Sequence, residues 1–248
     1  MHAHAQDGGA RVRAGASAPV GGDPAADAGV RVFLDLDGTL TDPREGITRS
    51  IRYALARLGR PAPPDADLTW CIGPPLQDSF AVLLGHDAAL VARAVALYRE
   101  RFGAVGILEN LLHTGIEDAL SRLSARGARL YVATSKPRVY ARRIVARFGL
   151  WRWIAEVFGA ELDGRLARKR DLLAHALAAT GGRRAPAVMV GDRRHDVHGA
   201  AANGLPTVAV LWGFGDRAEL SAAGADALIA APVELVAAVW SLAAPPRR

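Results

Sequence analysis

The sequence contains a single cysteine, Cys71, among its 248 residues. One thiol excludes an internal disulfide framework and a zinc site built from several cysteines. No apolar run is long enough to cross a bilayer, and residues 1–30 lack the apolar segment of a secretory signal. We therefore expect a soluble, cytoplasmic protein that does not bind a membrane.

Lysine is almost as scarce as cysteine. Lys136 and Lys169 are the only lysines, and the other basic residues among the 31 are arginines. The chain uses arginine at nearly all of its basic positions. Each lysine therefore marks a position where a compact ammonium is needed, or the two lysines occur by chance. The net charge of +6 suits a phosphate-bearing substrate. Nucleic acid is not an expected partner, because no recognised motif accompanies the arginines and few aromatics lie among them.

Apolar runs and amphipathic segments alternate along most of the chain. Strands are expected at 30–36, 129–133, 187–190, 207–211 and 226–229, and helices at 116–125, 139–148, 172–179, 198–203 and 232–242. This alternation predicts an α/β fold with a Rossmann-like, mostly parallel sheet. The core comprises residues 30–42 and 111–243. The Ala-, Gly- and Pro-rich residues 1–29 are expected to be a flexible leader, and 244–248 a tail.

One long segment, residues 43–110, interrupts the alternation directly after the first strand. It contains two amphipathic helices, 47–58 and 88–102, separated by the Pro- and Gly-rich loop 61–75. A helical insertion at this place is typical of a cap domain over the active edge of the sheet. Residues 72–77 are the loop expected to reach down toward a substrate.

Acidic and hydroxyl side chains follow several of the expected strands. Asp35 and Asp37 end the first strand, Thr134 and Ser135 end the second, and the segment 191–197 ends a later one. Ligands of open α/β sheets bind beyond the carboxyl ends of the strands, so these groups should meet. Oxygen ligands of this kind suit Mg²⁺.

Two carboxylates two residues apart suit phosphoryl transfer. One can attack phosphorus, while the other protonates the leaving oxygen and later activates water. Gly38 permits the tight turn that brings the backbone close to a ligand. The alternative is a solvated acidic turn.

The segment 35–42, Asp-Leu-Asp-Gly-Thr-Leu-Thr-Asp, resembles the first motif of the haloacid dehalogenase-like hydrolases. Thr134 after an apolar strand, Lys169 before a helix, and the acidic pair Asp192 and Asp196 match the other three motifs in order. The resemblance covers residues 30–242. Four ordered motifs are a far more specific signal than any one of them.

The resemblance implies a role for each matching residue. Asp35 corresponds to the nucleophile that becomes an aspartyl phosphate, and Asp37 to the general acid/base. Thr134, Ser135 and Lys169 bind the phosphoryl group, with Thr134 and Lys169 also counted among the catalytic residues. Magnesium is the implied cofactor, held by Asp35, Asp37 through its backbone carbonyl, Asp192 and Asp196. None of the motifs gives Lys136 a role.

The second aspartate, Asp37, is typical of phosphatases and absent from dehalogenases of this family. The segments 42–47 and 72–76 are similar to the phosphoglycolate phosphatase-like branch with a small helical cap. We therefore expect a phosphoric monoester hydrolase acting on a small phosphorylated metabolite, with phosphoglycolate as the first substrate. The alternatives are a 5′-nucleotidase acting on nucleoside monophosphates and a sugar phosphomutase. A non-catalytic binding protein ranks last, because both aspartates are present.

Overall fold

The computed structural model describes residues 29–182 and 185–243. The expected leader lies outside the described residues apart from Gly29, and the expected tail, 244–248, lies outside them entirely. Within the described part of the chain, no helix is both long and apolar enough to span a membrane.

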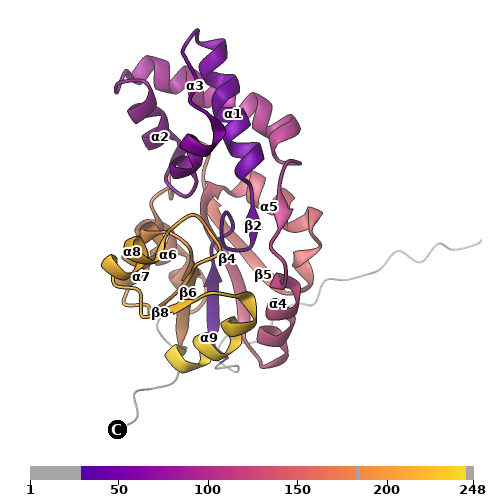
Figure 1. The fold of residues 1–248 in the computed structure, drawn as a ribbon. Coiled ribbons are helices and arrows are strands. Elements are labelled where there is room, and N and C mark those ends of the chain that lie inside the picture. The colour runs from indigo at the N-terminus through magenta and orange to yellow at the C-terminus, as the bar shows by residue number, and fades with distance from the viewer. Residues whose placement is uncertain (1–28, 183–184, 244–248) are drawn as a thin grey trace, which may run out of the picture.

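A six-stranded parallel sheet forms the centre of the molecule, in the order β5-β4-β1-β6-β7-β8 (Figure 1). Strand β1 pairs with β4 on one side and with β6 on the other. The α/β class and the parallel sheet expected from the sequence are confirmed. The strands are β1 (Arg31–Leu34), β4 (Arg129–Pro137), β5 (Ile154–Ala160), β6 (Ala187–Gly191), β7 (Thr207–Val210) and β8 (Ala227–Ile229).

Helices cover both faces of the sheet, so its strands are buried on either side. Successive residues of β1 point to opposite faces. Val32 and Leu34 belong to one hydrophobic cluster, which includes residues of three helices: α4 (Ile116–Ala125), α5 (Arg138–Arg147) and α9 (Leu235–Ala243). Phe33 belongs to another cluster, which includes residues of α6 (Lys169–Ala179) and α7 (Arg194–Ala201).

One strand of the six-stranded sheet, β5, and two α-helices, α2 (Leu76–Leu83) and α8 (Arg217–Ala222), are absent from the sequence-based expectation. Glu156 and Gly159 break the apolar run of β5, which lies at the edge of the sheet. Helix α7 begins four residues before the expected start at 198 and ends at Ala201. Its earlier start has a local cause, since the Asp196 carboxylate accepts the N–H of Arg193 at 3.1 Å.

Between β1 and β4 the chain forms a helical insertion. Its elements are α1 (Arg44–Arg57), the 3₁₀ helix η1 (Asp65–Cys71), α2, α3 (Ala88–Arg101) and the π-helical turn η2 (Phe102–Gly106). The chain leaves and rejoins the core through the antiparallel pair β2 (Thr41–Asp42) and β3 (Leu111–Leu112). The apolar face expected for α1 is buried, with Ile51 and Ala54 fully inaccessible. We propose that this insertion, residues 43–110, is the cap domain.

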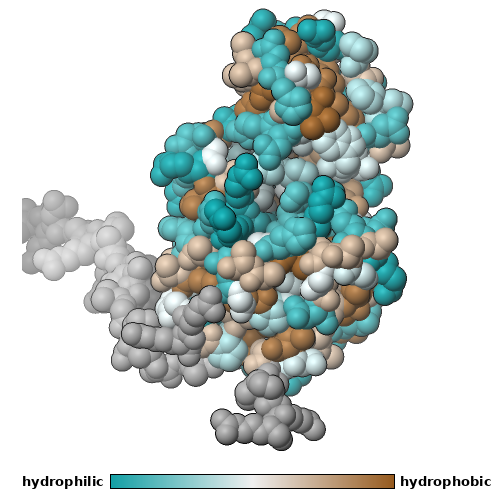
Figure 2. Space-filling model, turned by 90° about the vertical axis from the view of Figure 1, so that its left-hand side faces the viewer, coloured by the Kyte–Doolittle hydropathy of each residue, from teal (hydrophilic) through white to brown (hydrophobic). Residues whose placement is uncertain are grey.

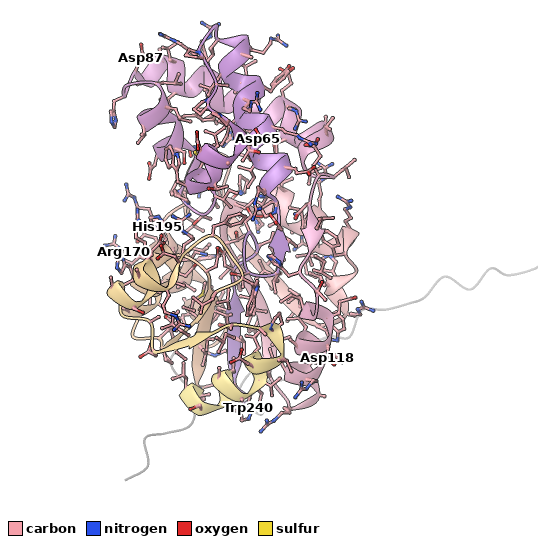
Figure 3. The ribbon with its side chains drawn as sticks, viewed as in Figure 1. Asp65, Asp87, Asp118, Arg170, His195 and Trp240 are labelled. Carbon is pink, nitrogen blue, oxygen red and sulfur yellow. The ribbon has the colours of Figure 1, made fainter. Side chains whose placement is uncertain are left out.

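The insertion stands over one end of the sheet, at the top of Figure 1. In Figure 3, the labelled residues Asp65 and Asp87 lie in the insertion, whereas Asp118 and Trp240 lie at the opposite end of the molecule, in the core. Hydrophilic residues surround the hollow between the two parts in Figure 2. A buried contact joins them, because Arg193 of the core donates from Nη1 to the carbonyl of Ile72 at 2.5 Å.

Candidate active site

The acidic and hydroxyl residues found in the sequence meet at the carboxyl ends of three adjacent strands. Asp35 directly follows β1, Thr134 lies near the end of β4, and Asp192 directly follows β6. The N–H of Asp35 still donates to the carbonyl of Val190 at 2.9 Å, which fixes the nucleophile candidate to the neighbouring strand. All three side chains are buried. The order β4-β1-β6 therefore positions these groups around one point.

Three carboxylates form a compact cluster there. Asp35, Asp192 and Asp196 each place an oxygen within 4.8 Å of the other two, and all three are at least 96% buried. Thr39 and the N–H of Phe214 hold the Asp192 carboxylate, through bonds of 3.1 and 2.8 Å. This carboxylate also explains Gly38, whose φ is +87° and where a Cβ would lie 2.6 Å from Asp192 Cγ.

The charge of this region suits a divalent cation. Four buried carboxylates, Asp35, Asp37, Asp192 and Asp196, face two buried ammonium groups, which leaves two negative charges. Burial, with Asp196 and Asp35 nearby, raises the pKa of Asp192 well above its usual range, and burial raises that of Asp196 to about 6. An all-oxygen donor set that needs positive charge fits Mg²⁺. The Asp37 carboxylate lies outside the three-residue cluster, in keeping with the expected role of its carbonyl.

Lys169 joins the cluster from the first residue of α6. Its Nζ lies 3.0 Å from Asp35 Oδ1 and 2.7 Å from Asp196 Oδ1, and it donates to the carbonyl of Ala133 at 2.9 Å. Burial alone would lower the pKa of this lysine, but Asp196 and Asp35 outweigh burial and raise it. Lys169 is therefore a fixed cation beside the candidate nucleophile. Asp196, expected as a metal ligand, pairs with this lysine in addition to lying in the carboxylate cluster.

Lys136 is a candidate site residue to which no motif gave a role. Its Nζ contacts Asp37 Oδ2 at 2.5 Å, and both side chains are buried. Burial raises the pKa of Asp37, and Lys136 opposes that shift. No motif gives Lys136 a role, but the structure places it against Asp37. The available signal was the scarcity of lysine, which marked Lys136 and Lys169 equally.

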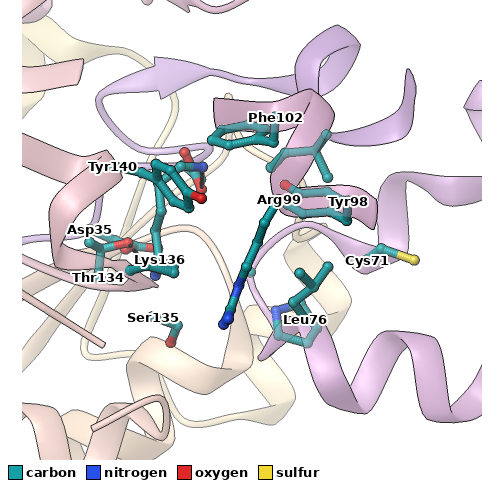
Figure 4. A pocket seen from close by; sticks show the side chains of 15 residues that line it. Asp35, Cys71, Leu76, Tyr98, Arg99, Phe102, Thr134, Ser135, Lys136 and Tyr140 are labelled. Carbon is teal, nitrogen blue, oxygen red and sulfur yellow. Dashed lines mark hydrogen bonds and ion pairs between the residues drawn. The ribbon is translucent and has the colours of Figure 1, made fainter. Parts of the chain in front are cut away.

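A pocket lies between this edge of the sheet and the insertion (Figure 4). Its space, opening included, is about 580 Å³. The core side contributes Asp35, Asp37, Thr134, Ser135, Lys136, Pro137 and Tyr140, and the insertion contributes Ile47, Cys71, Gly73, Pro74, Leu76, Tyr98, Arg99 and Phe102. Thr134 and Ser135, expected to bind substrate, therefore line it. The loop expected to reach the substrate, residues 72–77, contributes Gly73, Pro74 and Leu76. Ile72 is fully buried and, like Gln77, does not line the pocket.

Comparison with known proteins identifies the family. The model of the haloacid dehalogenase-like hydrolases matches residues 32–210, and the chain belongs to this family. Within it, the chain is a phosphatase, a phosphoric monoester hydrolase acting on small phosphorylated substrates. A predicted phosphatase from Clostridium acetobutylicum has the same fold, with a TM-score of 0.83 and 37% identity over 88% of this chain and 100% of that one.

Three curated relatives differ in their stated activities. A 5′-nucleotidase from Pseudomonas aeruginosa is 48% identical over 77% of this chain and 86% of its own length. Tyrosine-protein kinase PtkA from Mycobacterium tuberculosis is 44% identical over 74% of this chain, which spans only 62% of that relative. A phosphoglycolate phosphatase from Cupriavidus necator is 30% identical over 80% of this chain and 87% of its own length.

Stabilisation by Mg²⁺ should depend on pH. Without metal, the folded-state pKa of Asp196, about 6, exceeds the ordinary carboxyl value, so the folded protein holds a proton that the unfolded chain releases. This contribution to stability is complete at low pH and is lost as pH rises through about 6. Mg²⁺ and the proton compete for the same carboxylates. We expect Mg²⁺ to raise the melting temperature over that in chelator more at pH about 7.5 than at pH about 5.

Asp196→Asn is the matched control, since an amide carries no titrating proton. In this variant the difference between the two pH values should shrink. An equal effect of Mg²⁺ at both pH values in the wild type would contradict binding at these carboxylates.

Proposed function

We propose that the protein is a Mg²⁺-dependent phosphatase that hydrolyses nucleoside monophosphates through an aspartyl phosphate on Asp35. The observation that carries the proposal is the aromatic pocket that opens directly onto Asp35 and Asp37. The 48% identity to a 5′-nucleotidase supports the same substrate class. Phosphoglycolate, the first substrate expected from the sequence, has weaker support, because the phosphoglycolate phosphatase from Cupriavidus necator is only 30% identical to this chain.

The aromatic lining of the pocket favours a nucleoside over a two-carbon acid. Three aromatic residues line it, Tyr98, Phe102 and Tyr140, with Phe102 stacked on Tyr98 at 5.3 Å and edge-on to Tyr140 at 5.4 Å. Tyr98 and Phe102 are buried, whereas Tyr140 is half-buried and is the ring that can offer a stacking surface to a nucleobase.

Arg99 extends from α3 into this pocket in Figure 4. Its Nη2 donates to the carbonyl of Leu162 at 2.8 Å, while its Nε is buried and has no hydrogen-bond partner in the described part of the chain. A buried donor without a partner costs free energy, which a ligand oxygen or ring nitrogen could recover. We therefore expect Arg99 to donate a hydrogen bond to the base or the ribose.

The proposed reaction has two steps, both carried by residues at the end of β1. In the first, a carboxylate oxygen of Asp35 bonds to phosphorus, the bond from phosphorus to the 5′-oxygen breaks, and Asp37 gives that oxygen its proton. In the second, Asp37 takes a proton from water, whose oxygen attacks phosphorus and releases phosphate and the free Asp35 carboxylate. Thr134, Ser135 and Lys169 bind the phosphoryl oxygens during both steps.

Asp35, Asp192, Asp196 and the carbonyl of Asp37 would hold the Mg²⁺, which neutralises the buried carboxylates and withdraws charge from the phosphoryl oxygens. Lys169 supplies the remaining positive charge between Asp35 and Asp196. The insertion covers this region and limits the access of water, so hydrolysis depends on the water that Asp37 activates.

Asp35→Asn and Asp37→Asn should separate the two roles. An amide cannot attack phosphorus, so Asp35→Asn should form no aspartyl phosphate and release no phosphate. Asp37→Asn should lower kcat with a nucleoside monophosphate by about 100-fold or more, because the leaving oxygen receives no proton. Phosphate release and trapping of the phosphoenzyme measure the two effects. Wild-type turnover by Asp35→Asn would require another nucleophile.

A phosphate-release screen with Mg²⁺ tests the substrate class directly. We expect kcat/KM for nucleoside 5′-monophosphates to exceed that for phosphoglycolate. A higher value for phosphoglycolate would refute the nucleotide assignment. Transfer of the phosphoryl group to another hydroxyl of the substrate, without release of phosphate, would instead identify a phosphomutase.

Tyr140→Leu should weaken recognition of the base. Loss of one stacking surface should raise KM for a nucleoside monophosphate about 10-fold and leave KM for phosphoglycolate nearly unchanged. Tyr53→Leu is the control, because Tyr53 lies on α1 and does not line the pocket. An unchanged ratio of kcat/KM between the two esters would place the specificity outside the aromatic pocket.

A further inference from the structure

Both lysines of the chain are in the active site, and each is paired with a different aspartate of the first motif. Lys169 contacts Asp35, and Lys136 contacts Asp37. The two lysine side chains are 3% and 5% exposed, respectively, in a protein whose other basic residues are arginines. The role of Lys169 beside the nucleophile follows from the family motif. Lys136 belongs to none of the four motifs, so its role must come from its contacts.

An irregularity of β4 directs Lys136 into the site. The register with β5 shifts between Thr134 and Pro137, so the regular pairing is interrupted at Lys136. Gly159 of β5 accommodates the displaced chain, because a Cβ there would lie 2.8 Å from the carbonyl oxygen of Lys136. Such irregularities re-aim side chains next to functional sites. The side chain of Lys136 thereby reaches Asp37, which lies 99 positions earlier in the sequence.

The ammonium of Lys136 has two partners on opposite parts of the molecule. One is Asp37 Oδ2 at 2.5 Å, and the other is the ring of Phe102, whose centroid lies 4.6 Å from Nζ. Phe102 begins the π-helical turn η2 of the insertion and is 1% exposed. A compact ammonium can contact a carboxylate and a ring face at once, whereas a planar guanidinium imposes its own geometry on both.

These contacts leave the two oxygens of Asp37 in different states. Oδ2 is engaged by Lys136, while Oδ1 is buried and has no hydrogen-bond partner among the described residues. Asp37 also lines the pocket in which the leaving group would lie. A carboxylate held through one oxygen presents the other in a fixed direction, and such orientation controls the rate of proton transfer.

We propose that Lys136 is a positioning residue that holds the Asp37 carboxyl group through Oδ2, so that a proton on Oδ1 can be transferred to the leaving oxygen, and that Phe102 of the insertion keeps Lys136 in place. The inference rests on the proposed function, since it assigns a residue to the same reaction. It also links the insertion to the chemistry. The position of the Phe102 ring fixes the ammonium of Lys136, which in turn fixes the acid/base group, Asp37. The competing role for Lys136 is direct binding of the substrate phosphate.

Two esters with different leaving groups distinguish these roles. The 5′-oxygen of a nucleoside is a poor leaving group that needs a proton, whereas p-nitrophenolate leaves readily without one. The parameter kcat/KM reports the steps up to release of the alcohol or phenol. Lys136→Met should therefore lower kcat/KM about 100-fold for a nucleoside monophosphate, mainly through kcat, and far less for p-nitrophenyl phosphate.

Lys169→Met is the matched control within the chain. It removes the other buried, aspartate-paired lysine, but Lys169 acts on the nucleophile and phosphoryl group that both esters share. We expect it to lower kcat/KM for both esters by similar factors. Thermal denaturation of each variant verifies that the fold is kept. Phe102→Leu, which leaves Lys136 intact, should produce a weaker form of the ester-dependent loss seen with Lys136→Met.

A double-mutant cycle with Asp37→Asn completes the test. If Lys136 acts through Asp37, adding Lys136→Met to Asp37→Asn should cost little further activity with the nucleoside monophosphate. Independent, multiplying losses would overturn the proposal, as would equal losses for both esters in Lys136→Met. A raised KM at unchanged kcat would assign Lys136 to phosphate binding instead. Failure of the wild type to release phosphate from either ester would refute the proposed function, and the positioning role with it.

Discussion

The structure depends on the burial of four carboxylates at one edge of a sheet. Asp35, Asp37, Asp192 and Asp196 are each at most 7% exposed, and Lys136 and Lys169 are the two ammonium groups in contact with them. Buried charges are costly unless they are paired, and here the pairing leaves two negative charges. A site with this shortage of positive charge suits a divalent cation.

The core fold supplies the positions that this charge cluster requires. Parallel strands end at the same edge, so residues that follow β1, β4 and β6 meet although they are far apart in the sequence. Backbone donors and short side chains then fix the acids individually, as Thr39 and the N–H of Phe214 do for Asp192. Gly38 leaves room for that carboxylate where any side chain would collide with it. The acids are held rigidly, which preorganised catalysis needs.

The insertion adds a second set of constraints. It is joined to the core near the site by the bond from Arg193 to the Ile72 carbonyl and by the contact of Lys136 with the Phe102 ring. Arg193 follows the acid Asp192, and Lys136 contacts the acid Asp37. Both contacts therefore connect the insertion with residues of the charged edge. The substrate pocket and the catalytic groups are parts of one packed arrangement.

The sequence by itself determined the α/β class, the helical insertion after the first strand, and the candidate acids with Thr134 and Lys169, because these features depend on local periodicity and contiguous motifs. It did not reveal β5, whose apolar run is broken by a glutamate and a glycine. It also did not reveal α2, a short helix that directly follows a Pro-Pro pair. Only the tertiary structure showed that Lys136 contacts Asp37. Its partner is 99 positions away, and the contact exists because β4 departs from regular pairing beside Gly159. A contact created by strand irregularity and long-range packing leaves no local pattern in the sequence. Its only trace there is a lysine in a chain that otherwise uses arginine.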